Sequence, residues 1–263
     1  MTTVVVKLGG HALEATSDAA LLLDGLADDL LALRDKGDVV VLVHGGGPQI
    51  NALVASLGIE TSFVEGLRVT TDAVLDCVVM GLSHVNAILV AELVKRGVPA
   101  VGVHGASLGL LTCPQRSNTL GAVGLHPSAN PALLATLTGQ GMIPIIAPYA
   151  TDVEGRLVNC NADAAAGAVA SAMTADVLLL LSDIDQVRRD PTDPATGVAQ
   201  LSGAEARNLL ASGGAQDGMR PKIESALAAI DHGACRVVIA NGSQPHSVRD
   251  VLSRTVPVTE VVA

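Results

Sequence analysis

Six short apolar runs, separated by longer segments with helical character, constrain the fold of this chain more than any other feature. The runs are rich in Val, Ile and Leu, as in strands that are buried on both faces. Because strands and helices alternate along the chain, we expect an α/β protein: a three-layer αβα sandwich with a central, mostly parallel sheet. The runs cover residues 3–6, 39–43, 100–103, 142–147, 177–181 and 236–240.

Helix signals lie between these runs. Pro48 is suited to the first turn of a helix, and a long apolar segment ends at Gly97. Ser202 and Glu205 have the spacing of a capping box. The expected helices follow Ser17, begin near Pro48, and cover 71–96, 161–175, 202–212 and 219–232.

The segment from Leu108 to Val158 breaks the alternation. Turn residues there separate short β-like pieces, so we expect a hairpin-rich insertion around one helix. We divide the chain into an N-terminal lobe, residues 1–150, and a C-terminal lobe, residues 151–263, that share one sheet.

Composition excludes several classes of function. Aromatic residues make up 1% of the 263 residues and the net charge is -10, so we expect no nucleic-acid partner. The N-terminus lacks the features of a signal peptide, and no apolar run approaches the roughly 20 residues that span a bilayer. We therefore expect a cytoplasmic protein without a membrane partner. The four cysteines show no metal-ligand spacing, which predicts reduced, mostly buried thiols.

Two glycine-rich loops follow apolar runs. In "VLVHGGGPQI" the run ends in Gly45, Gly46 and Gly47, and in "VVVKLGG" it ends in Gly9 and Gly10. Backbone N–H groups at such a helix start can bind an anion, although a tight turn alone would also use glycine. Neither loop has the P-loop or Rossmann spacing. Two such loops suggest a long ligand with several negative charges.

Two of the four lysines stand in unusual places. Lys7 interrupts an apolar strand, where a buried ammonium group needs an anionic partner. Lys222 lies just inside a helix start, where the helix dipole disfavours a cation. A bound phosphate would explain both positions. For Lys7, an ion pair with Asp163 or Asp183 is the alternative, and both interpretations can hold together.

Polar residues complete the candidate site. Asn159, Asn161 and Asp163 precede or begin a helix of small residues, where their side chains cap the helix or face a cleft. Ser182 and Asp183 end the most hydrophobic run, at the sheet edge where ligands bind in α/β proteins.

A serine hydrolase is the competing interpretation. "HGGG" at 44–47 resembles the oxyanion-hole segment of some esterases, and "GASLG" at 105–109 offers Ser107 as nucleophile, with His232 or His246 as base. A nucleophile elbow must turn from a strand directly into a helix. The stretch that follows has a proline and two glycines instead, so the structural context does not fit.

Six motifs follow one another along the chain: "KLGG" at 7–10, "HGGGPQIN" at 44–51, "GLRVT" at 66–70, "NCNADAAAGA" at 159–168, "LLSD" at 180–183 and "DGMRPKI" at 217–223. In this order they resemble the motifs of the N-acetylglutamate kinases of the amino acid kinase superfamily, and "GLRVT" is the most specific of them. The resemblance implies an αβα fold, ATP as phosphoryl donor with Mg²⁺ bound through its phosphates, and the γ-carboxylate of N-acetyl-L-glutamate as acceptor.

The resemblance also implies roles for single residues. The implied catalytic residues are Lys7 and Lys222, on either side of the transferring phosphoryl group, and Asp163, which orients both lysines. The implied acceptor-binding residues, with Arg68 on the α-carboxylate, are Gly45, Gly46, Arg68 and Asn159. The residues implied at the ATP phosphates are Gly9, Gly10, Gly46, Ser182 and Asp183.

The chain departs from the family pattern at two places. Gln186 stands where the family commonly has glycine, which puts the nucleotide-binding turn in doubt. Residues 104–109 also differ from the family pattern. Two alternatives therefore stay open: a kinase that acts on a related acceptor, such as an N-modified aminoadipate or glutamate, and a catalytically weak family member that binds amino acid or nucleotide as a sensor. Arginine-inhibited relatives carry an extra N-terminal helix, whereas the first strand here begins at Thr3. We therefore expect a homodimer that pairs through the helix at 71–96 and is insensitive to arginine.

Overall fold

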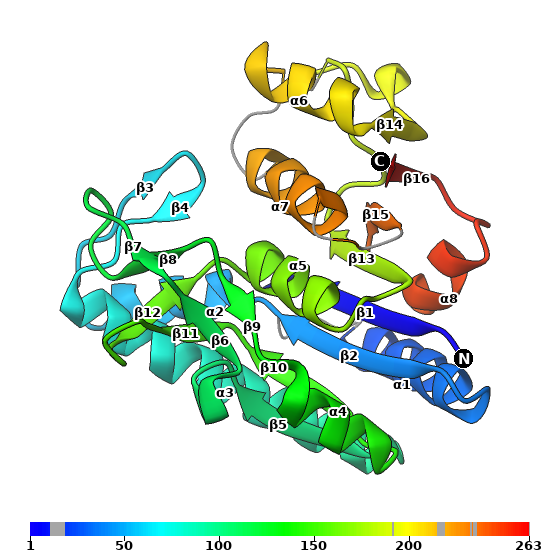
Figure 1. Ribbon diagram of the computed structural model, residues 1–263, viewed down its shortest axis with the longest axis horizontal. Coiled ribbons are helices and arrows are strands. Elements are labelled where there is room, and N and C mark those ends of the chain that lie inside the picture. The colour runs from blue at the N-terminus through cyan, green and yellow to red at the C-terminus, as the bar shows by residue number, and fades with distance from the viewer. Residues whose placement is uncertain (11–18, 191, 215–218, 232, 234–235, 263) are drawn as a thin grey trace.

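Eight strands form one central sheet in the computed structural model, in the order β14-β16-β15-β13-β1-β2-β10-β5 (Figure 1). All neighbouring strands are parallel except β15 and β16. The structure describes residues 1–10, 19–190, 192–214, 219–231, 233 and 236–262. The strands are β1 (Thr3–Leu8), β2 (Val39–His44), β5 (Ala100–His104), β10 (Ile143–Ala147), β13 (Val177–Ser182), β14 (Gln200–Ser202), β15 (Val237–Asn241) and β16 (Val258–Val262).

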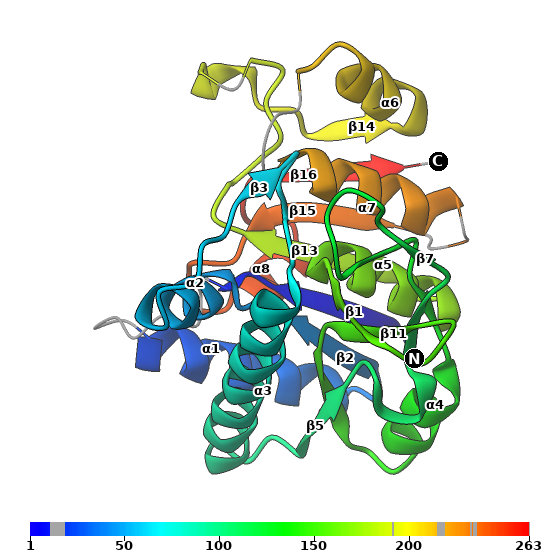
Figure 2. The same ribbon diagram turned by 90° about the vertical axis from the view of Figure 1, so that its left-hand side faces the viewer.

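Helices cover both faces of this sheet, which confirms the expected αβα sandwich (Figures 1 and 2). The helices α4, α5 and α7 contact one face, and α1, α3 and α8 contact the other, while α2 packs on α3 and α6 on α7. The helices are α1 (Ala19–Asp35), α2 (Gly47–Ser56), α3 (Asp72–Lys95), α4 (Pro131–Gly139), α5 (Ala162–Ala172), α6 (Gly203–Ala211), α7 (Met219–Asp231) and α8 (Ser247–Leu252).

Two hydrophobic cores result from this layering. Successive strand residues point to opposite faces, so Val4 and Val6 pack with α1 and α3, while Val5 packs with α5 and α7. The strands are buried on both sides, as their uninterrupted apolar sequences predict. Since β1 pairs with both β2 and β13, strands from residues 1–150 and 151–263 belong to one sheet.

The segment between β5 and α5 contains the expected hairpins around one helix. Its short strands form a second sheet in the order β7-β8-β12-β11-β6-β9. A separate hairpin, β3–β4, stands beside α2 and α3 in Figure 2. These strands are β3 (Phe63–Val64), β4 (Leu67–Arg68), β6 (Leu111–Cys113), β7 (Gln115–Arg116), β8 (Val123–Leu125), β9 (Ser128–Ala129), β11 (Tyr149–Asp152) and β12 (Leu157–Cys160), with 3₁₀ turns η2 (Ser107–Gly109) and η3 (Pro194–Thr196).

The helix α3 corrects one expectation drawn from composition. It is long and apolar enough to cross a membrane by length and composition alone, with a mean hydropathy of 1.9 over its most apolar window. However, Val78, Val85 and Leu89 on one side of α3 are buried inside the protein, and the helix packs against β5 and β10. The apolar residues on this side of α3 therefore belong to the core.

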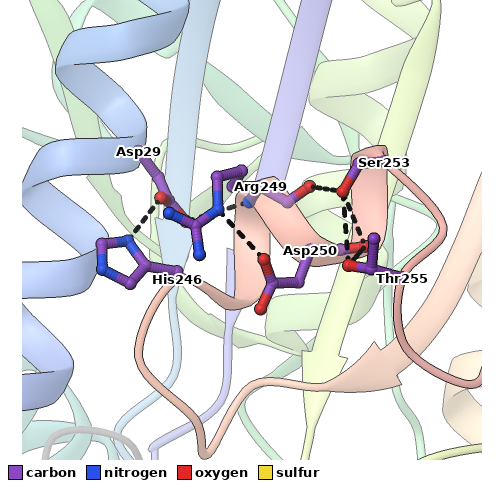
Figure 3. A network of polar contacts seen from close by, with 6 residues as sticks. All are labelled: Asp29, His246, Arg249, Asp250, Ser253 and Thr255. Atoms are coloured by element: carbon purple, nitrogen blue, oxygen red, sulfur yellow. Dashed lines mark hydrogen bonds and ion pairs between the residues drawn. The ribbon is translucent and has the colours of Figure 1, made fainter.

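The helix α8 takes its N-terminal cap from α1 (Figure 3). His246 stands at the N-cap position with a left-handed backbone, and its side chain makes no cap. The buried Asp29 of α1 accepts the Arg249 N–H at 2.9 Å, and its other oxygen lies 3.0 Å from His246 Nδ1. One side chain from α1 thus satisfies a backbone donor in the first turn of α8.

Candidate active site

Two lysines from distant parts of the chain meet on one carboxylate. Lys7 Nζ, from β1, lies 2.8 Å from Asp163 Oδ1, and Lys222 Nζ, from α7, lies 3.2 Å from Asp163 Oδ2. Asp163 is in the first turn of α5, which Asn161 caps by accepting the N–H groups of Asp163 and Ala164. For Asn161 the cap interpretation is therefore correct. The carboxyl end of β1 and the start of α5 bring the three charged groups together.

The electrostatics of this cluster favour an additional anion. Burial alone would raise the pKa of Asp163, but the two ammonium groups outweigh it and the net shift is downward. The pKa of Lys7 is lowered, first by burial and then by the nearby Lys222, against the attraction of Asp163. Two cationic side chains share one buried carboxylate, and a bound phosphate would supply the charge that this cluster lacks.

The two glycine loops lie against each other beside this cluster. A Cβ atom on Gly10 would stand 3.1 Å from both Gly46 N and Gly47 N, and a Cβ on Gly45 would stand 3.0 Å from Gly10 N. The backbone amides of the two loops thus lie close together, and a side chain on Gly10 or Gly45 would fill the space between them. Because the first N–H groups of a helix have no acceptor within the helix, the start of α2 offers donors to an anion here.

A cavity of about 250 Å³ joins these parts. Its walls bring together nine of the glycine-loop and polar residues that the sequence singles out: Lys7, Gly10, Gly45, Gly46, Gly47, Arg68, Asn159, Asn161 and Asp163. Gly9, Ser182, Asp183 and Lys222 are not part of its wall.

The remaining residues that we expect at the ATP phosphates lie at or near the end of β13. A Cβ on Gly9 would stand 3.3 Å from Leu181 O, so the first glycine loop approaches this strand closely. Ser182 Oγ is buried and has no hydrogen-bond partner among the described residues. Asp183 follows it and is exposed. A buried hydroxyl without a partner is costly unless a ligand supplies one.

Arg68 supplies a further positive charge in the cavity wall. Its guanidinium donates to Asn51 Oδ1 at 2.6 Å and to Thr61 Oγ1 at 3.3 Å, and lies 4.6 Å from the centre of the Phe63 ring. The residue is 7% exposed, and no carboxylate among the described residues pairs with it. Burial lowers the pKa of Arg68. A buried guanidinium without a counter-ion in a cavity wall favours a carboxylate ligand.

Sequence reasoning missed Asn51 and Phe63. Asn51 ends the "HGGGPQIN" motif, yet nothing in its helical surroundings indicates a partner in the β3–β4 hairpin. Phe63 is the only phenylalanine of the chain and 52% exposed, an unusual position that could have drawn attention to the hairpin. Asn159, which also lines the cavity, donates to Thr70 Oγ1 at 3.0 Å.

Gln186, the departure from the family pattern, has a structural partner. Its Nε2 donates to Val258 O at 2.9 Å, and a Cβ on Gly197 would collide with its side chain. The neighbouring Val187 N–H donates to Thr259 Oγ1 at 2.9 Å. Gln186 therefore helps to fasten the segment after β13 to β16.

The hydrolase interpretation finds no geometric support. Ser107 begins the 3₁₀ turn η2, which leads into β6 rather than into a helix. His246 pairs with Asp29 beside α8, and α8 packs on β15. Ser107 follows β5, and β15 and β5 are five strand spacings, or roughly 24 Å, apart in the sheet. His232 lies outside the described residues. Of the two proposed bases, the structure therefore places His246 away from Ser107.

Comparison with known proteins agrees with this geometry. The sequence model of the amino acid kinase family matches residues 2–241. This chain belongs to the amino acid kinase family. Among relatives in that family, an acetylglutamate kinase from Ruegeria pomeroyi is 42% identical over 93% of this chain and 83% of its own length. One from Archaeoglobus fulgidus is 35% identical over 94% of this chain and 88% of its own length.

Solved structures extend the similarity. An N-acetylglutamate synthase from Neisseria gonorrhoeae, complexed with coenzyme A and N-acetyl-glutamate, has a TM-score of 0.82 at 27% identity, over 100% of this chain and 59% of that one. A protein from Streptococcus mutans has a TM-score of 0.82 at 26% identity, over 99% of this chain and 98% of that one. Carbamate kinase from Giardia lamblia, at 17% identity and a TM-score of 0.70, shares the amino acid kinase fold.

Proposed function

We propose that this member of the amino acid kinase family phosphorylates the γ-carboxylate of N-acetyl-L-glutamate with ATP, as in arginine biosynthesis. One observation carries the proposal: a single cavity has the Lys7–Asp163 pair in its wall together with Arg68, which lacks a counter-ion. A diacid fits such a cavity, with one carboxylate at the guanidinium and the other near the lysines. The acetylglutamate kinases that resemble this chain support the choice of acceptor.

The acceptor needs no general base in this reaction. A carboxylate is already ionised at neutral pH, so one of its oxygens can attack the γ-phosphorus directly. The new bond is O–P, the bond from phosphorus to the β,γ-bridging oxygen breaks, and ADP leaves with the electron pair. Arg68 binds the α-carboxylate and Asn159 lines the same cavity, and together they hold the attacking oxygen in line.

The two lysines and the glycine loops stabilise charge on the transferring group. Lys7 and Lys222 lie on either side of it, and Asp163 keeps both ammonium groups in position. The amides of Gly9, Gly10 and Gly46 donate to phosphate and acceptor oxygens, whereas the Gly45 N–H donates to Leu8 O and holds the two loops together. Catalysis is therefore positioning and electrostatics, as in other phosphoryl transfers.

Ser182 and Asp183 fit the nucleotide side of the site. The unpartnered Ser182 Oγ can donate to a phosphate oxygen, and Asp183 follows at the strand end. In this proposal Mg²⁺ binds through the ATP phosphates. When bound, Mg²⁺ would neutralise phosphate charge. In this scheme the N-terminal lobe, residues 1–150, binds the acceptor, and the C-terminal lobe, residues 151–263, binds ATP. The proposed location of the enzyme is the cytoplasm.

The proposal includes a homodimer that forms through α3. The outer side of this helix exposes a stripe of mainly apolar side chains, interrupted by His84, which includes Met80, Ile88 and Val94, each about half exposed. These three side chains lie within about 120° of each other around the helix. An exposed apolar stripe of this length is typical of a subunit interface. Nucleic acid and membrane are not partners in this proposal.

A hydroxylamine trap of the acyl phosphate tests the activity. Purified protein is incubated with ATP, Mg²⁺ and hydroxylamine together with N-acetyl-L-glutamate, N-acetyl-L-aspartate, an N-acetylated aminoadipate or free glutamate. We expect hydroxamate with N-acetyl-L-glutamate above all. Highest turnover with another diacid would favour the alternative acceptor, and no hydroxamate with any acceptor would contradict the kinase. Labelling of Ser107 by a fluorophosphonate would support a hydrolase.

A further inference from the structure

His44 is a buried polar residue that the proposed reaction does not yet use. It is the last residue of β2, directly before the glycine loop, and is 0% exposed. Both ring nitrogens have partners: Nδ1 lies 2.8 Å from Gly45 O, and Nε2 lies 3.1 Å from Asn86 Nδ2 of α3. A wall residue of the cavity, Gly45, is thus linked to the core helix α3 through one imidazole ring.

The neighbours of the ring determine which nitrogen carries the proton. Asn86 Nδ2 donates to Ile145 O at 2.9 Å, and a carbonyl oxygen can only accept. The second hydrogen of the same amide nitrogen faces Nε2 of His44, so Nε2 must be unprotonated. The proton is therefore on Nδ1, and Nδ1–H donates to Gly45 O.

The side chain of Asn86 is also closely packed at its other end. A Cβ atom on Gly102 in β5 would overlap with Asn86 Oδ1. The amide oxygen thus occupies space that only a glycine leaves free, while the amide nitrogen faces Ile145 O and the ring. Burial lowers the pKa of His44 to about 4, so the ring is neutral at physiological pH and this polarity does not change.

The bond to Gly45 O decides where the next amide points. In a trans peptide the C=O and the following N–H point in opposite directions. The Gly45–Gly46 peptide has no side chains to hold it, and glycine peptides rotate readily. With Gly45 O held by the buried ring, Gly46 N–H points to the other side, toward Gly10 and the cavity. A rotated peptide would present a carbonyl oxygen to a phosphate.

We propose that His44 is a positioning residue whose Nδ1–H fixes the Gly45–Gly46 peptide with the Gly46 N–H aimed at the transferring phosphoryl group. The chain of hydrogen bonds runs from Ile145 O through Asn86 and His44 to the glycine loop. This inference rests on the proposed kinase reaction for its purpose, but its geometry does not depend on which acceptor is used.

Two matched substitutions separate positioning from general stability. In His44→Asn the side-chain amide can occupy the place of Nδ1 and still donate to Gly45 O. In His44→Gln the amide occupies the place of Nε2, so it keeps a contact with Asn86 but not the donor to Gly45. We expect H44N to keep kcat within about 5-fold, and H44Q to lower kcat by about 100-fold, the effect of losing one such donor, with acceptor KM changed less than about 3-fold.

Stability and spectroscopy complete the test. Both variants leave a small cavity, so we expect similar losses in urea unfolding. If kcat follows stability rather than donor position, or if H44Q is as active as H44N, the proposal is wrong. Imidazole ¹⁵N spectra of the wild type should show His44 as the Nδ1–H tautomer, assigned by its loss in H44N. An Nε2–H tautomer would overturn the proposal even in an active kinase, whereas a wild type without hydroxamate activity would contradict the proposed function alone.

Discussion

Asp163 shows how one buried charge can serve both folding and catalysis. It is 5% exposed and contacts two ammonium groups, so its removal leaves two cations without their common partner. We expect Asp163→Asn to reduce kcat at least 100-fold, because both lysines lose their position. We also expect a loss of about 3–5 kcal/mol in the free energy of unfolding, the usual effect of breaking a buried ion pair.

Steady-state kinetics and urea unfolding check this prediction, with Asp163→Glu as the control that keeps the charge. The glutamate variant should retain more stability than the asparagine variant. An asparagine variant with wild-type kcat would show that the lysines do not need their carboxylate.

His44 also predicts how stability depends on pH. Its folded pKa is about 4, below the ordinary value of 6.5, because burial disfavours the charged ring. Between pH 4 and pH 6.5 the His44 ring binds a proton in the unfolded chain but not in the folded protein. The contribution of the neutral His44 ring to stability is therefore full above pH 6.5 and is lost as the pH falls toward 4. From pH 7 to pH 5 the contribution falls by about 2 kcal/mol.

Urea unfolding of the wild type and of His44→Gln at pH 7 and pH 5 measures the contribution of the His44 ring to stability. The glutamine variant lacks this titrating ring and keeps the other titrating groups. The wild type should lose about 2 kcal/mol more than the variant. Equal losses in both proteins would mean that the buried ring does not resist protonation.

At the scale of elements, the sequence predicted what depends on local pattern and missed what depends on distant partners. The six apolar runs are all strands of the main sheet, and Ser202 and Glu205 form the expected capping box. The edge strand β14, its neighbour β16 and the helix α8 were not expected, because they depend on tertiary contacts. The cap of α8 comes from Asp29, far away in the sequence.

The same limit applies to the site. Lys7 and Lys222 stand out because a cation is unfavourable at each place in the local pattern, and the motifs then indicate their neighbours. The residues that support the site do not stand out in the sequence. Asn51 of α2 holds Arg68 of the β3–β4 hairpin, and Asn86 of α3 orients His44 of β2. Polar residues on helices have many ordinary positions, so only the coordinates show which ones support the site.

The link between α1 and α8 gives a prediction at this scale. Asp29→Ala removes the acceptor for the Arg249 N–H and the partner of His246, so we expect a loss of about 1–2 kcal/mol in the free energy of unfolding, as for other lost caps. Neither helix contributes to the cavity wall, so kcat should stay within about 2-fold of wild type. Asp29→Asn, which keeps one acceptor oxygen, is the control and should lose less stability. A large fall in kcat in the alanine variant would contradict this separation of the α1–α8 link from the site.

At the scale of the whole molecule, α3 carries two tasks on its two sides. Its inner side contributes Leu82 to the cavity wall and Asn86 to the His44 contact. Its outer side exposes the apolar stripe proposed as the subunit interface. A dimer would hold this helix between two cores and so stabilise both active sites.

The dimer prediction follows from the size of this stripe. A helix of 24 residues is about 36 Å long, enough for a stable interface of roughly 800 Å² per subunit. Glutamate at Met80 and Ile88 would place charges in an apolar contact, so we expect the double variant M80E/I88E to sediment as a monomer at micromolar concentration. Leu21→Glu, at an equally exposed leucine of α1, should leave the dimer intact. Analytical ultracentrifugation distinguishes these outcomes: a wild type that sediments as a monomer, or a double variant that stays dimeric, would assign the apolar side of α3 another role.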